Sequence, residues 1–265
     1  MAVRHVPENP LTSIAKSHDH LAEIRRTLQL AAPVMFGQVA VFSMNFIDTV
    51  MAGRLPQKDI ALAGLGIGGA LWSAFMVFLI GVLMAVQPSV AQLDGAGRPV
   101  EAGRVVRQAL WIALAVAVPF WALSFFSEGL LLLVHIDPSI IPTAAGYLRA
   151  LSWGAPGICL VFLLRFFSEG AGHTMPTMAY GIAGALLNIP FNYVLMFGKL
   201  GFPALGAVGC GYATAAIIWI QVIFLCCICI AIAFTFPSSY SVTGMHLIGL
   251  TSASCCTWAF PSRYR

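Results

Sequence analysis

The sequence predicts an all-α polytopic membrane protein with six transmembrane helices. Its composition is 59% hydrophobic and only 9% charged, whereas an ordinary soluble domain has about 25% charged residues. Apolar runs longer than the roughly 20 residues needed to cross a bilayer recur along nearly the whole chain. We therefore expect one helical bundle embedded in the lipid bilayer.

Six apolar runs are the predicted spans, and short connectors containing Gly, Pro or charge separate them. The spans cover residues 28–51, 60–90, 106–127, 141–166, 177–197 and 207–236. Because the connectors are short, neighbouring spans should be antiparallel. Residues 1–27 form an N-terminal tail, and residues 237–265 form a C-terminal tail. The first run begins too late and is too long for a cleaved signal peptide.

The distribution of Lys and Arg predicts the orientation. If the N-terminus is cytoplasmic, eight of these residues fall on the cytoplasmic side and four on the other, which favours this arrangement. The cytoplasmic set is Arg4, Lys16, Arg25, Arg26, Arg98, Arg104, Arg107 and Arg165; the other set is Arg54, Lys58, Arg149 and Lys199. Since these charges are scattered and form no basic face, nucleic acid is not an expected partner.

Enzyme and metal chemistry find little support in the sequence. No nucleophile, base and orienting group can be assembled, and no cofactor motif is present. Cys226 and Cys229 have C-x-x-C spacing, but neither a second pair nor a nearby His accompanies them, so a metal site is not predicted. The glycines of residues 64–69 and 206–211 indicate close helix packing rather than a nucleotide-binding loop.

The informative residues are the few polar groups inside the apolar runs. Asp48, in the stretch NFIDTVMAG, is an ionisable group near the end of the first span, where such a group costs several kcal/mol unless it is paired or wet. Asn188 and Asn192 are four residues apart and so share one helix face. Pro190, between them, should bend the helix and free a backbone carbonyl. An amide-lined, bent helix beside a carboxylate suits the binding of a small cation.

Two alternatives stay open for these residues. The asparagines would simply join helices through hydrogen bonds, which average about 0.6 kcal/mol each in membranes, and Asp48 would be solvated at the outer interface. Among the other polar residues, Glu128 and Asp137 flank a connector and should be wet. Arg165 and Glu169, four residues apart at a helix end, are expected to form an interfacial ion pair rather than a substrate clamp.

Several of these motifs resemble the multidrug and toxic compound extrusion (MATE) transporters, specifically their bacterial multidrug branch. The resemblance covers roughly residues 25–236 and depends on the order of five motifs. They are residues 32–34 (APV), 45–53 (NFIDTVMAG), 90–95 (VAQLDG), 187–193 (LNIPFNY) and 206–214 (GAVGCGYAT).

The resemblance implies a fold of twelve helices in two six-helix lobes, of which this chain matches the N-terminal lobe. It also implies a multi-pass protein of the bacterial inner membrane that exports cationic, amphipathic drugs in exchange for Na⁺ or H⁺, without another cofactor. In that family the cation site of the N-terminal lobe carries over onto Asp48, Asn188, Asn192 and Thr214. Pro33 matches a proline associated with bending of the first helix.

The sequence departs from the family pattern after the sixth span. Residues 247–258 (LIGLTSASCCTW) do not resemble the start of a seventh family helix, so we expect a truncated or frameshifted product. Because alternating access requires two bundles, such a chain would be inactive alone unless it had a C-terminal lobe as partner or paired with a second copy.

Two rival interpretations remain. One is half of a major-facilitator transporter, since residues 94–98 (DGAGR) resemble a loop motif of that superfamily. The other is a non-transporting membrane scaffold, in which the polar residues would serve only helix packing.

Overall fold

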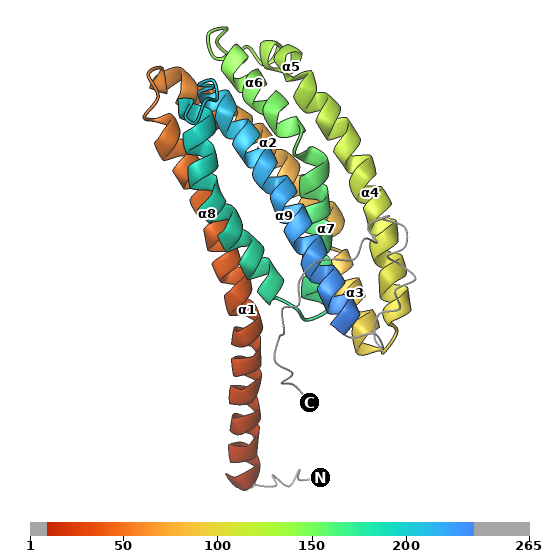
Figure 1. The fold of residues 1–265 in the computed structure, drawn as a ribbon. Helices are drawn as coiled ribbons and strands as arrows, with labels where there is room; N and C mark the ends of the chain where they lie inside the picture. The colour runs from red at the N-terminus through yellow and green to blue at the C-terminus, as the bar shows by residue number, and fades with distance from the viewer. Residues whose placement is uncertain (1–9, 236–265) are drawn as a thin grey trace, which may run out of the picture.

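The computed structural model describes residues 10–235, and every regular element in that range is a helix (Figure 1). The all-α prediction is therefore confirmed. The elements are α1 (Pro10–Ala52), α2 (Lys58–Leu83), α3 (Val86–Gly95), α4 (Pro99–Phe125), α5 (Ser127–Leu133), α6 (Ile141–Ser152), α7 (Ala155–Gly170), α8 (Met175–Phe197) and α9 (Ala207–Thr235).

The number of membrane spans agrees with the sequence prediction. Within the described range, five helical segments are long and apolar enough to cross a membrane, and a sixth span results if the bent pair α6 and α7 is counted as one. The two helices of that pair meet at an angle of 52°. Pro156, in the first turn of α7, explains the break, because proline fits a helix start but cannot continue the preceding helix.

The second predicted span is interrupted in the structure. It consists of α2 and α3, which together form the candidate span Lys58–Gly95, with a break at Met84 and Ala85. Pro88 accounts for the break, because its ring would clash with the carbonyl of Met84 in a continuous helix and it lacks the N–H that would bond that carbonyl.

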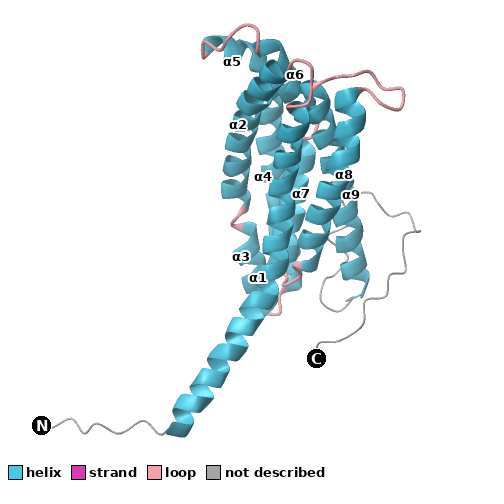
Figure 2. Ribbon diagram, turned by 90° about the vertical axis from the view of Figure 1, so that its left-hand side faces the viewer, coloured by secondary structure: helices cyan, strands magenta, loops and turns pink. Residues whose placement is uncertain are grey.

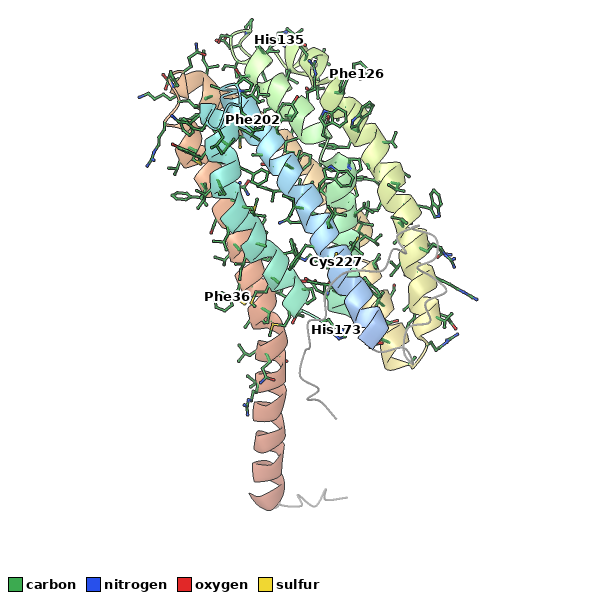
Figure 3. All side chains as sticks on the ribbon, viewed as in Figure 1. Phe36, Phe126, His135, His173, Phe202 and Cys227 are labelled. Carbon is green, nitrogen blue, oxygen red and sulfur yellow. The ribbon has the colours of Figure 1, made fainter. Side chains whose placement is uncertain are left out.

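The helices form an elongated bundle in which α1 packs along α8, α8 along α9, and α9 against both α6 and α7. Figure 1 shows α1 and α8 at one side of the bundle and α4 at the other, and Figure 2 shows the N-terminal part of α1 leaving the bundle in the view turned by 90°. Apolar side chains of α2, α4 and α7 fill the space between these helices, including Phe75, Leu79, Phe120 and Phe166. Phe36 lies on the outer face of α1, where it is 66% exposed and points away from the bundle (Figure 3).

Two features differ from the predicted organisation, and the two ends of the chain lie outside the described residues. Helix α1 begins at Pro10, so helix extends through residues predicted as an N-terminal tail, and this part projects beyond the bundle (Figure 1). A short helix, α5, occupies part of the connector after the third span. The predicted C-terminal tail, residues 237–265, lies outside the described residues, as do residues 1–9.

Pro33 and Pro190 lie inside α1 and α8, and each of these helices continues past its proline. A bend at either position stays a prediction.

Candidate functional site

Asp48 of α1 and two asparagines of α8 form a buried polar cluster. The side chain of Asn188 donates from Nδ2 to Asp48 Oδ1 at 2.9 Å, and Asn192 donates to the same oxygen at 2.5 Å. Asp48 is 8% exposed, and both asparagines are fully buried. The spacing of four residues brings both amides to the face of α8 that meets α1, so the interaction of a carboxylate with two stacked amides follows the sequence pattern.

The carboxylate has no ion-pair partner among the described residues. Salt bridges in that range include those of Arg98 with Glu101, Arg149 with Glu128 and Arg165 with Glu169, and none of these involves Asp48. Two amide donors stabilise an ionised carboxylate but do not neutralise it. A buried charge without a counter-ion is costly, so the cluster is suited to take up a cation or a proton.

The residues of this region carry buried oxygen atoms that could bind a cation. A carboxylate only accepts hydrogen bonds, so each asparagine turns its Nδ2 toward Asp48 and its Oδ1 elsewhere. The Oδ1 atoms of Asn188 and Asn192 and the Oγ1 atom of Thr214 are buried without a hydrogen-bond partner. Hard cations prefer oxygen ligands of this kind, and the available set contains one carboxylate and three neutral oxygens.

Helix α9 brings Thr214 to the same region. Cys210, four residues earlier and fully buried, interacts with both Asp48 and Thr214. Thr214 itself is half-buried. The structure therefore brings together Asp48, Asn188 and Asn192 by direct contact, and places Thr214 beside them across Cys210.

Sequence reasoning missed two residues of this region. Cys210 was not predicted as a site residue, although its spacing of four from Thr214 places it on the same face of α9. Tyr147 of α6 is buried against Ala52 and Cys210 and interacts with Asp48. Nothing in the sequence around Tyr147 indicates this interaction, because it depends on how α6 packs against α9.

The two prolines differ in their relation to the cluster. Pro190 lies between the two asparagines, and its missing N–H leaves the carbonyl of Leu186 without its usual helical partner. Pro33 is buried in α1 but lies 15 residues before Asp48, which is about 22 Å along a helix. Pro33 is therefore not part of the cluster.

The other predicted polar residues behave differently. Arg165 and Glu169 form the expected ion pair, with Arg165 Nε 2.8 Å from Glu169 Oε1. The two side chains are only 9% and 5% exposed, so the pair is buried within the protein, and its interfacial depth in the membrane stays a prediction. Their burial depends on the packing of α7 against α3, α4 and α9 and on the contacts of Arg165 with Gln38 and Tyr180, which residue spacing does not show.

Glu128 and Asp137 are exposed, as predicted. The backbone N–H of Ser139 donates to Asp137 Oδ1 at 2.9 Å and holds the pKa of that carboxyl below its ordinary value. Both residues lie between α4 and α6 in the chain and are not part of the Asp48 cluster.

Within residues 10–235 no group of three or more His, Cys, Asp or Glu side chains is placed to hold a metal ion. The fold and the Asp48 cluster define the class of protein: a polytopic membrane protein whose bundle encloses an ionisable group without a cationic partner in the described range. Such groups in membrane spans are typical of ion pathways and proton relays.

Within that class, the chain belongs to the MatE family, whose family model matches residues 33–194. Its relatives are transporters and not enzymes. It is 39% identical over 207 residues to the multidrug resistance protein MdtK of Yersinia enterocolitica, a match that covers 78% of this chain and 45% of MdtK. The protein of the same name from Yersinia pestis matches with the same identity and coverage. The chain thus spans less than half the length of these relatives.

Solved structures show the same fold. The eukaryotic MATE transporter AtDTX14 superposes with a TM-score of 0.72 at 19% identity, over 83% of this chain and 47% of AtDTX14. A multidrug resistance MATE transporter in its outward-facing conformation gives a TM-score of 0.68 at 22% identity, over 76% of this chain and 43% of that one. This family membership replaces the major-facilitator alternative.

Proposed function

We propose that this chain supplies the N-terminal lobe of a cation-coupled antiporter that exports cationic, amphipathic drug-like molecules in exchange for Na⁺ or H⁺. The observation that carries the proposal is the buried Asp48 carboxylate, which has two amide donors, no cationic partner in the described range, and unpartnered oxygens beside it. The family relationship supports this function, because the MdtK relatives are named as multidrug resistance proteins.

In the proposed mechanism, Asp48 alternates between two states. When it is protonated or bound to Na⁺, its charge is neutralised; when it releases the ion, the free carboxylate attracts a cationic substrate. Asn188 and Asn192 stabilise the ionised state through their donors, and their Oδ1 atoms with Thr214 Oγ1 act as ligands for Na⁺. The exchange biases the bends at Pro33 and Pro190 and so couples the ion to the substrate.

Transport also requires a second bundle, because alternating access moves two bundles about a central site. The chain covers 45% of the MdtK relatives, so the proposed partner is a C-terminal lobe of the same family. A second copy of this chain is the alternative partner. The proposed location is the bacterial inner membrane, with a cytoplasmic N-terminus.

Drug efflux in cells that lack endogenous pumps tests the function. The chain is compared alone, fused to the C-terminal lobe of an MdtK relative, and fused with Asp48→Asn; the exposed Asp59→Asn variant is the matched control. We expect the fused parent and the Asp59 variant to export a cationic dye and the Asp48 variant to fail. Equal export by the Asp48 variant would remove the coupling role.

The non-transporting scaffold is distinguished by ion binding. If the asparagines only join α1 to α8, the purified chain should bind no coupling cation, and Asp48→Asn should change only its stability. Binding of radioactive Na⁺, or uptake of a proton on drug release, that disappears in Asp48→Asn would exclude the scaffold.

A further inference from the structure

A second buried polar cluster joins the same two helices that form the Asp48 site. Its centre is Arg165 of α7, which bonds Glu169 on its own helix. Its Nη1 atom donates to Gln38 Oε1 of α1 at 3.1 Å and to the hydroxyl of Tyr180 of α8 at 3.5 Å. One guanidinium group therefore contacts three helices.

The cluster lies where the backbones of α1 and α8 are in direct contact. A Cβ atom added to Gly37 would come within 2.9 Å of the carbonyl oxygen of Thr177, and one added to Gly181 would come within 2.8 Å of the carbonyl oxygen of Gly37. Small residues permit such close approach between membrane helices. Gln38 and Tyr180 directly adjoin these glycines in the sequence, so Arg165 contacts both helices at this close approach.

This contact lies on the same α1–α8 packing surface as the proposed cation site. Gln38 precedes Asp48 by ten residues, and Tyr180 precedes Asn188 by eight, which correspond to about 15 Å and 12 Å along the helices. Gln38 also lies on the Asp48 side of Pro33. A bend at Pro33 would thus leave the segment from Gln38 to Asp48 attached to α8 through Arg165.

The charges of the cluster suit a structural connection rather than a second ion site. Glu169 neutralises the guanidinium of Arg165, and the two remaining partners are neutral acceptors. Arginine has five donors in a rigid planar fork and can bond several acceptors at fixed angles, whereas lysine presents a single flexible ammonium group. The Asp48 cluster shows the opposite condition, a buried charge without a counter-ion in the described range.

We propose that Arg165 is a positioning residue that fixes α1 against α8 through Gln38 and Tyr180 and thereby holds Asp48 at Asn188 and Asn192. The inference rests on the proposed cation site for its functional meaning. The positional effect on Asp48 is measurable whether or not that site binds a cation.

The probe is N,N′-dicyclohexylcarbodiimide, which enters apolar regions and reacts with protonated carboxyl groups. The amide donors of Asn188 and Asn192 favour the ionised carboxylate, so their displacement should accelerate labelling. The whole chain is placed in lipid nanodiscs, and modification of Asp48 is followed by peptide mass spectrometry. Asp48→Asn identifies the labelled peptide.

Four variants are compared with the parent. Gln38→Leu removes the acceptor on α1, and Tyr180→Phe removes only one hydroxyl group. Gln38→Glu keeps an acceptor for Arg165 at this position. Arg149→Gln removes an exposed arginine that pairs with Glu128 at 3.6 Å and serves as the matched control. The thermal unfolding midpoint of each variant shows whether it is folded.

We expect Gln38→Leu to label Asp48 about tenfold faster, the factor that corresponds to one lost hydrogen bond to a charged group. Tyr180→Phe should shift the rate in the same direction by less, and Gln38→Glu and Arg149→Gln should match the parent. The inference is overturned if the folded Gln38→Leu and Tyr180→Phe variants label at the parental rate, or if Gln38→Glu labels as fast as Gln38→Leu.

A separate arm tests the proposed function. Protection of Asp48 in the parent by Na⁺ or by tetraphenylphosphonium, a cationic drug analogue, supports the cation site. If neither ion protects, binding of Na⁺ and of a cationic drug by this lobe is contradicted, while the comparison of variant rates still decides the role of Arg165.

Discussion

At the scale of residues, the Asp48 cluster combines a buried carboxylate with two neutral donors and no cationic partner in the described range, which is the condition that the proposed cation exchange requires. Two amide groups donate to the same oxygen, which lowers the cost of burying the charge without removing the charge. A basic residue at this place would have neutralised Asp48 permanently. Because asparagine carries no charge, the place beside Asp48 stays available for the proposed cation.

Removal of one amide tests this role of the asparagines. We expect Asn188→Ala to lower the affinity of the site for Na⁺ about tenfold, because it removes the Oδ1 ligand, and an interaction with a charged group corresponds to roughly 1.5 kcal/mol. Its affinity for a proton should instead rise, because the lost Nδ2 donor stabilised the ionised carboxylate. Asn45→Ala, at an exposed position of α1, is the control. Cation binding by calorimetry measures the change, and equal affinity of the two variants would contradict the assignment.

Thr214 offers a change at the other side of the cluster. Thr214→Val keeps the shape of the side chain and removes the buried, unpartnered hydroxyl. If that oxygen is a cation ligand, we expect cation affinity to fall by severalfold while the unfolding midpoint stays constant or rises, since a buried polar atom without a partner is itself destabilising. Thr49→Val, on an exposed part of α1, is the matched control. Undiminished affinity in Thr214→Val would exclude Thr214 from the site.

The sequence was sufficient for part of this site. The intramembrane position of Asp48 and the spacing of Asn188 and Asn192 predicted a shared face, and the structure brings these three side chains into contact. Tyr147 and the burial of Arg165 were not predictable from spacing, because both depend on contacts between helices far apart in the chain. Cys210 was within reach of a periodicity argument and was missed.

At the scale of elements, glycines set the distance between α1 and α8. The backbone contact at Gly37 and Gly181 has no room for a side chain, whereas Gly66 on α2 has no atom within 4 Å of an added Cβ. Gly181 and Gly66 both lie in apolar helices, but only Gly66 has room for a larger side chain. The sequence alone does not distinguish them.

This difference gives a matched pair of substitutions. Gly181→Ala should destabilise the protein by about 1–3 kcal/mol through overpacking, while Gly66→Ala should be neutral or stabilising by up to about 1 kcal/mol, because alanine is the better helix former. Thermal unfolding in nanodiscs measures both. A stable Gly181→Ala together with a destabilised Gly66→Ala would contradict the described packing.

Prolines act on the same elements in a different way. Pro190→Ala supplies the N–H that the carbonyl of Leu186 lacks and removes the ring from the helix interior. We therefore expect a higher unfolding midpoint for this variant, and slower drug transport in the fused protein if a bend at Pro190 takes part in coupling. Faster transport with a lower midpoint would show that neither effect operates.

At the scale of the whole molecule, the helical membrane fold was predictable because long apolar runs permit few other structures in lipid. The six predicted spans correspond to five long segments and one bent pair in the described range. The bend between α6 and α7 and the extension of α1 to Pro10 were not predicted. Hydropathy reports where a segment is apolar, but it does not report the direction of its axis or where a polar helix continues beyond the membrane.

The half-length match to MdtK relatives makes the second bundle the main requirement for transport. The most direct test is dye transport by the purified fused protein in liposomes under an imposed Na⁺ or H⁺ gradient. We predict that the parent and Asp59→Asn move a cationic dye against one of these gradients and that Asp48→Asn moves none. Gradient-driven transport by Asp48→Asn at the parental rate would contradict the assignment of Asp48, Asn188 and Asn192 as the coupling site.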